Sequence, residues 1–192
     1  RMSQQVVQEQ NDKSYSNAGR TLLLDSSMNR NENSVLLKGL NGLNKHHFSE
    51  KSGKYFLEFN TRENSVSAYE ILLSNDKCRV KYCNYDIFVK YKNLNNNDVD
   101  YQALGNKHTK WIEEKTGANV LRYKPYKKGD KYLGCGQITI DTKDSFDLLT
   151  SSEGLRSFSF EGVSGTHYKY NKQRRNTSDE GNQKSFAAVL NN

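Results

Sequence analysis

The chain has 192 residues, of which 34% are hydrophobic, so it is long enough for one medium domain or two small ones. Its 29 lysine and arginine residues outnumber 22 aspartate and glutamate residues. The resulting net charge of +7 makes a polyanion the leading class of partner. No run reaches the roughly 18 apolar residues of a membrane span, and the first residues lack the apolar stretch of a signal peptide. We therefore expect an intracellular protein, nuclear or cytoplasmic, without membrane contact.

The two ends of the chain differ in composition from its middle. Residues 1–18 and 176–192 are rich in Gln, Asn, Ser and Asp and have no hydrophobic period, so we predict two flexible tails. Between them the apolar period changes several times between two and about 3.6 residues, which indicates interleaved strands and helices.

A first cycle of elements is predicted within residues 19–85. In chain order it comprises a buried strand at 21–25, a helix within 31–43, a link through 46–48 counted as a weak strand, a strand at 54–60, a helix at 62–75 and a strand at 78–84. Asn31 or Asn33 is the expected cap of the first helix, and Thr61 precedes the second. Two glycines weaken the first helix, and a strand through 35–40 is the competing interpretation.

A second cycle follows within residues 86–175. Its predicted elements are a strand at 87–94, a helix within 98–117, a strand at 120–126, a turn at 127–130, a strand at 132–140, a helix at 143–151 and a last strand at 156–163. Gly117 is the expected stop of the first helix, and Trp111 on that helix is expected to pack in the core. Thr142 is the expected cap of the second helix and Gly154 its end. The element order of the first cycle therefore repeats.

Two successive β-α-β-β-α-β units resemble a pair of RNA recognition motif (RRM) domains over about residues 20–170. In the second unit Ile87, Phe88, Val89 and Leu94 are similar to the family's inner-strand signature; in the first, Gly53, Phe56, Leu57 and Phe59 are similar to its adjacent-strand signature. The resemblance implies an α+β fold, with two ferredoxin-like (RRM-like) domains packed in tandem. It also implies binding of single-stranded RNA.

Other positions depart from the family's pattern. Leu23, Lys54, Leu133, Cys135 and Gln137 stand where the family offers rings, so one ring per unit, Phe56 and Phe88, is predicted to stack on a base. One ring contributes roughly 1 to 3 kcal/mol, so phosphate contacts must add much of the affinity. The predicted RNA-binding residues are Lys54, Phe56, Phe88, Lys90, Lys92, Arg122, Lys124, Lys127, Lys128, Lys131, Tyr168, Lys169, Tyr170, Lys172, Arg174 and Arg175. The last six are expected just past the final strand.

The sequence contains no recognisable catalytic or cofactor motif, so we expect a non-enzymatic protein with no cofactor, metal or small-molecule substrate. Cys78 and Cys83 are predicted to be half-buried strand residues, because no second Cys or His pair has metal-ligand spacing. An alternative function is a protein-interaction module that recognises a peptide of a partner in a ribonucleoprotein complex. Double-stranded RNA and single-stranded DNA also stay open as ligands.

Overall fold

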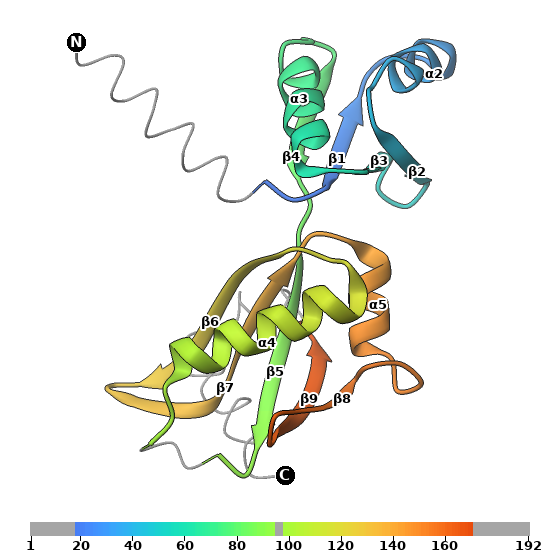
Figure 1. The fold of residues 1–192 in the computed structure, drawn as a ribbon. Helices are drawn as coiled ribbons and strands as arrows, with labels where there is room; N and C mark the ends of the chain where they lie inside the picture. Colours follow the sequence, from blue (N-terminus) through green and yellow to red (C-terminus); the bar gives the residue numbers. More distant parts are fainter. Residues whose placement is uncertain (1–17, 95–97, 171–192) are drawn as a thin grey trace, which may run out of the picture.

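The computed structural model describes residues 18–94 and 98–170, which form two sheets joined in tandem (Figure 1). The first unit contains β1 (Thr21–Ser26), α2 (Arg30–Lys38), β2 (Leu43–Ser49), β3 (Lys54–Phe59), α3 (Arg62–Leu73) and β4 (Cys78–Tyr82). Its antiparallel sheet has the order β2-β3-β1-β4. None of the helices in the described ranges is long and apolar enough to cross a bilayer.

The second unit repeats this plan with one additional strand. It contains β5 (Tyr85–Lys92), α4 (Tyr101–Thr116), β6 (Val120–Lys128), β7 (Lys131–Ile140), α5 (Lys143–Thr150), β8 (Ser157–Phe160) and β9 (Val163–Lys169), and its sheet order is β6-β7-β5-β9-β8. The predicted fold class, two βαββαβ units in tandem, is confirmed. In each unit the first strand lies beside the third and the last, so it is an inner strand of its sheet.

Several predicted boundaries are wrong in detail. Asn29, rather than Asn31 or Asn33, caps α2 through a reciprocal capping box with Glu32, and no strand runs through 35–40. Thr142 is the N-cap residue of α5, as predicted, but its side chain donates to the Ser145 hydroxyl instead of accepting from a backbone N–H; the helix ends at Thr150, before Gly154.

The largest correction concerns the last strand of the second unit. The predicted strand at 156–163 contains β8 and the turn after it, and the chain then returns as β9, which pairs with β5. Glu161 and Gly162 form this turn with φ of 46° and 77°, the left-handed backbone of a tight hairpin. Tyr168 and Lys169 therefore lie on the final strand, and not beyond it.

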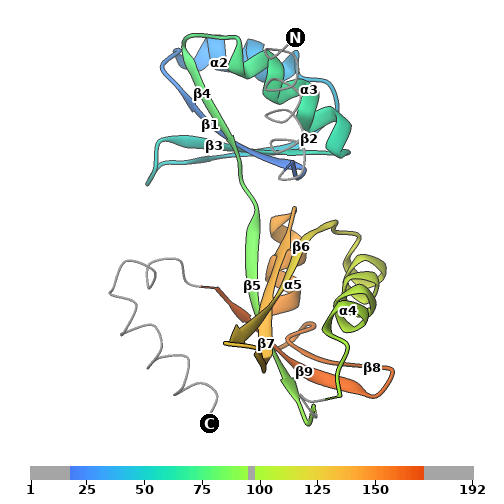
Figure 2. The ribbon, with the colours of Figure 1, turned by 90° about the vertical axis from the view of Figure 1, so that its left-hand side faces the viewer.

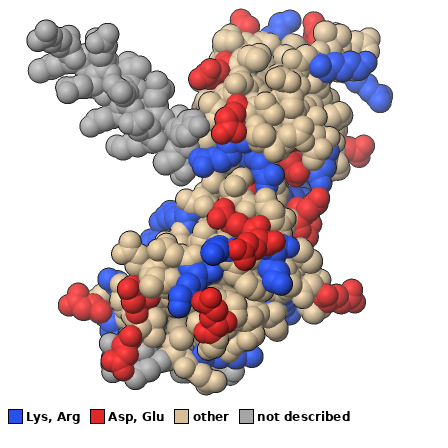
Figure 3. Space-filling model, viewed as in Figure 1, with Lys and Arg blue, Asp and Glu red and all other residues tan. Residues whose placement is uncertain are grey.

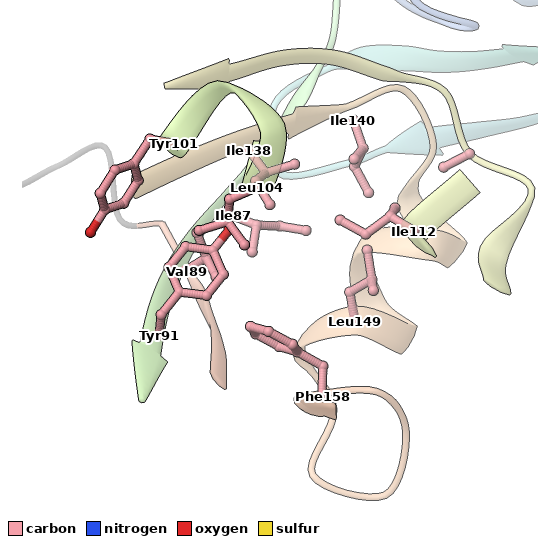
Figure 4. Close-up of a cluster of buried hydrophobic side chains, with 11 residues drawn as sticks. Ile87, Val89, Tyr91, Tyr101, Leu104, Ile112, Ile138, Ile140, Leu149 and Phe158 are labelled. Carbon is pink, nitrogen blue, oxygen red and sulfur yellow. The ribbon is translucent and has the colours of Figure 1, made fainter. Parts of the chain in front are cut away.

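Each unit has its own core on one side of its sheet. In the second, Ile87 and Val89 of β5 meet Ile138 of β7, Ile112 of α4 and Leu149 of α5 (Figure 4). Trp111 packs against this cluster, as predicted. The core of the first unit is built in the same way, from Leu22 and Leu24 of β1, Leu57 and Phe59 of β3, and residues of α2 and α3.

A buried aspartate joins the two units. The Asp141 carboxylate is fully buried and accepts from Arg20 Nε at 2.9 Å, from the Asn119 amide at 2.9 Å and from Asn119 Nδ2 at 2.8 Å. The Thr21 hydroxyl donates to the Asp141 carbonyl oxygen at 2.9 Å. A Cβ at Gly19 would lie 2.9 Å from the Asp141 Cβ, so only glycine fits this crossing. Arg20 and Thr21 thus fix the first unit on the second.

Replacing Arg20 by Ala should release the two units from each other. The buried Asp141 carboxylate would keep only the Asn119 donors, at a cost of about 2 kcal/mol in unfolding free energy. Lys45→Ala is the matched control, because Lys45 also bridges the units but pairs with Asp144 in an exposed position worth under about 1 kcal/mol. NMR relaxation should give the units one common rotational correlation time in the wild type and in Lys45→Ala, and two different times in Arg20→Ala. Common tumbling in Arg20→Ala would contradict this role.

A chain of buried polar groups crosses the second core. His167 Nδ1 lies 2.9 Å from the Leu155 carbonyl oxygen, which can only accept, so this nitrogen carries the proton. His167 Nε2 then accepts from His108 Nε2–H at 2.9 Å. His108 Nδ1 accepts from the Tyr91 hydroxyl at 2.7 Å, and Tyr91 in turn accepts from the Tyr123 hydroxyl at 2.9 Å. In this arrangement both imidazoles are neutral and every group has a partner.

Burial sets the protonation of this chain. It lowers the pKa of His167 to about 4 and lowers that of His108 well below 6.5, with the neighbouring His167 adding to the effect. Burial also raises the pKa of Tyr123 to about 12. The network is therefore uncharged near neutral pH.

Stability should fall as the pH drops below 6.5. The unfolded histidines take up protons near pH 6.5 and the folded ones do not, so the unfolded state binds more protons. His167, whose folded pKa is about 4, accounts for a loss of about 2 kcal/mol between pH 7.5 and pH 5, and His108 adds to the loss in the same direction. Urea unfolding at the two pH values measures this loss. His167→Gln should remove the part of the loss that is due to His167. Equal wild-type stability at both pH values would rule out the neutral pair.

Candidate nucleic-acid interface

The helices of the described ranges cover only one side of each sheet. Figure 2 shows α4 on one side of the second sheet, and none of the described helices lies on the other side. Along β5, Ile87, Val89 and Tyr91 point into the core, so the alternation of a strand turns Phe88 and Lys90 to the helix-free side. We call this side of the second sheet the open face.

Three aromatic rings form a row across the open face. The Phe88 ring centroid lies 6.2 Å from that of Tyr126 on β6 and 6.0 Å from that of Tyr168 on β9. The Arg156 guanidinium lies 5.3 Å from the Tyr168 centroid, and the Tyr126 hydroxyl donates to Gln137 Oε1 at 3.2 Å. Rings and a stacked guanidinium of this kind present flat surfaces for planar ligands.

The structure places Phe88 on the predicted face but leaves it only 7% exposed. The rings of Tyr126 and Tyr168 flank it on neighbouring strands and are themselves half-buried. The accessible rings of the row are therefore Tyr126 and Tyr168, with Phe88 packed between them. Sequence reasoning had selected Phe88 and Tyr168 and missed Tyr126.

A signal for Tyr126 was present in the sequence. Arg122, Lys124 and Tyr126 alternate along one strand, so a side that carries two cations also carries the ring. Arg156 had no such signal, because it precedes β8, an additional strand, and reaches Tyr168 only through the return of β9.

Cations surround the row of rings. Lys90 and Lys92 share the side of Phe88 on β5, and the register of β6 with β7 places Arg122 and Lys124 on the same side. Among the described strand residues of the open face, the single acidic one is Asp86, and its carboxylate accepts from the Thr139 hydroxyl at 2.7 Å. Acidic and basic side chains intermingle instead over the side covered by α4 (Figure 3). The positive excess of this unit is thus concentrated on its open face.

Other predicted site residues lie away from the row. Lys127 Nζ lies 4.4 Å from the Tyr132 ring centroid, and that ring stacks on Tyr101 of α4, so Lys127 is on the helix side. Lys169 pairs with Ile87 and belongs to the side opposite Tyr168. Lys128 and Lys131 are exposed at the tip of the β6–β7 hairpin. Tyr170 donates its amide to the Asp86 carbonyl oxygen at 3.4 Å, whereas Lys172, Arg174 and Arg175 lie outside the described residues.

The first sheet presents a smaller version of the same arrangement. Phe56 lies on its helix-free side and is half-buried, between His47 on β2 and Leu23 on β1 in the strand register. Lys81 of β4 continues this row, and Lys54, two residues before Phe56 on β3, shares the same side. The row contains one aromatic carbon ring where the second sheet has three.

The predicted exceptions Leu133, Cys135 and Gln137 lie on β7 as expected, and Gln137 supports Tyr126. Burial raises the pKa of the Cys135 thiol to about 11, so this cysteine is protonated. Cys78 is buried in β4 and Cys83 half-buried just after it. No group of three metal-binding side chains occurs within 18–94 and 98–170.

No protein-family model and no curated protein sequence match the chain. Among solved structures, the chain overlaps the first two RRM domains of the yeast poly(U)-binding protein Pub1 with 12% identity, over 80% of this chain and 100% of that one, at a TM-score of 0.34. The RNA recognition domains 1 and 2 of Drosophila melanogaster Sex-lethal give 14% identity, 67% and 89% coverage and a TM-score of 0.27. The three N-terminal RNA-binding domains of the yeast splicing factor Prp24 have 13% identity over 79% of this chain and 63% of that one, at a TM-score of 0.31. The fold of this chain is established by its own strand order, and these distant overlaps add no information on its ligand.

Proposed function

We propose that the protein is a non-catalytic RNA-binding protein that holds single-stranded RNA on the open face of its second sheet. The supporting observation is the row Tyr126, Phe88 and Tyr168, bordered by cations and by one acid, Asp86. Unpaired bases can stack on the accessible rings, while Lys90, Lys92, Arg122 and Lys124 reach the phosphates.

The two units would contribute unequally. Two accessible rings on the second sheet supply roughly 2 to 6 kcal/mol by stacking, and Phe56 on the first adds roughly 1 to 3 kcal/mol. Because Arg20 and Asp141 fix the units on each other, the strand meets two surfaces already held in place, which reduces the entropy cost of binding both. Rings and lysines tolerate any base, so we expect modest sequence preference.

Replacing Tyr126 and Tyr168 together by Ala should weaken binding of a single-stranded uridine oligonucleotide by tenfold or more, because both stacking surfaces are removed. Replacing Arg122 and Lys124 together by Gln should reduce the slope of log affinity against log salt by about 1.4, because two cations no longer neutralise phosphates. Fluorescence anisotropy at several salt concentrations measures both effects.

The matched control is the pair Lys110→Gln and Lys115→Gln, which removes the same charge from α4 on the other side of the sheet. It should change neither affinity nor slope by more than a small amount. If the control pair and the Arg122, Lys124 pair weaken binding equally, RNA is attracted by net charge alone and the proposed face is wrong.

The alternative function, recognition of a partner's peptide, predicts a different salt response on this face. A contact made by apolar rings would change little as salt is added, whereas phosphate contacts weaken steeply. The cations around the rings favour RNA.

A further inference from the structure

The first unit contains a second surface, on the helix side of its sheet and away from Phe56. A groove of about 1170 Å³ lies between α2 and the β2–β3 hairpin. Leu37, Leu40 and Tyr55 contribute to its apolar lining, and Phe48 stands over it with 44% of its surface exposed. The Phe48 and Tyr55 ring centroids are 4.8 Å apart, so the two rings form one wall.

The groove runs along an unprotected sheet edge. Strand β2 is the outer strand of the sheet, pairs with β3 alone among the described strands, and has exposed side chains at its five central positions. The opposite edge of this sheet, β4, has five residues, and in the second sheet β8 has four. Strand β6 is interrupted by Pro125 and two register shifts. Short strands, proline and bulges hinder pairing with another chain, and β2 has only one shift, at its start.

The groove is positively charged at its rim. Arg30 and Lys38 stand at the two ends of α2, line the groove and take part in none of the ion pairs found between described residues. Lys45 also lines it but is paired with Asp144, and Glu50 is the one acid in the lining. An occupant with carboxylates near its ends therefore fits best.

From this geometry we propose that β2 and its groove bind an extended, acidic peptide segment of a partner protein, which joins the first sheet as a fifth strand. Backbone groups along β2 would pair with the peptide, alternate apolar side chains would enter the groove beside Phe48, and acidic residues at its ends would meet Arg30 and Lys38. A strand of seven residues matches a peptide of about the same length. RNA has no peptide backbone that could pair with a strand. A second copy of this chain would bring its own Arg30 and Lys38 against these cations. The proposed peptide site lies on the side of the first sheet opposite Phe56. Its test is therefore independent of whether the protein binds RNA.

An array of short peptides with alternating apolar and polar positions, flanked by Glu, Gln or Lys, tests the proposal on the full chain. The wild type should select Glu-flanked members over Lys-flanked ones by about tenfold, and the double charge reversal Arg30→Glu with Lys38→Glu should invert this preference. Phe48→Ala should weaken the best peptide about tenfold or more. Val35→Ala is the control, because Val35 is an exposed apolar residue of α2 that does not line the groove.

Two further measurements distinguish a peptide in the groove from RNA or a second copy of the chain. N-methylation of alternate amides on one edge of the best peptide should abolish its binding, and a single-stranded uridine oligonucleotide should not displace it. Absence of a flank preference, indifference to N-methylation, displacement by the oligonucleotide, or a chain dimer that Phe48→Ala dissolves would each overturn the proposal. An unchanged urea unfolding transition in Phe48→Ala shows that the first unit is folded.

Discussion

The one-sided packing of helices on each sheet is the constraint on which the rest of the structure depends. A strand has only two sides, and once Ile87, Val89 and Tyr91 are committed to the core, the residues between them must face outward. Antiparallel pairing then carries this choice to the neighbouring strands, so that Tyr168 and Gln137 lie beside Phe88. The chemistry of the open face thus follows from the burial of its opposite side.

The connection between the units has a comparable effect at larger scale. Only Cys83 and Asn84 separate β4 from β5, and the buried Asp141 adds a second attachment through Arg20 and Thr21. The carboxylate is shielded from solvent and fully provided with donors, so its loss costs more than that of an exposed pair such as Lys45 and Asp144. Two modest surfaces held in a fixed relation can bind one strand more tightly than either alone.

Much of the fold could be predicted from the sequence, because hydrophobic periodicity is a local property. Alternation in residues 54–59 and the glycine stop at Gly117 were sufficient to locate β3 and the end of α4. The β8–β9 hairpin was missed because Glu161 adopts a left-handed backbone conformation that is uncommon for glutamate. The sequence around it therefore predicts the end of a single strand. Partners distant in the chain, such as Arg20 with Asp141 or Arg156 with Tyr168, depend on tertiary contacts that no spacing encodes.

The site shows the same division. Phe56, Phe88 and the cations of β5 and β6 could be placed on a common side from their alternation, whereas the 7% exposure of Phe88 depends on rings brought from two other strands. Lys127 lies on the opposite side because Arg122, Lys124 and Tyr126 take the open face and the next residue along the strand points the other way, toward Tyr132. Strand alternation thus decides which cations of β6 a ligand meets.

Photo-crosslinking of the full chain to a thiouridine-containing single-stranded RNA, with mass spectrometry of the modified peptides, tests the open face as the binding surface most directly. The account predicts that nucleotides attach to the peptides that contain Tyr126 and Tyr168, with weaker modification at Phe56. Attachment confined to α4, α5 or the β6–β7 hairpin tip would contradict it.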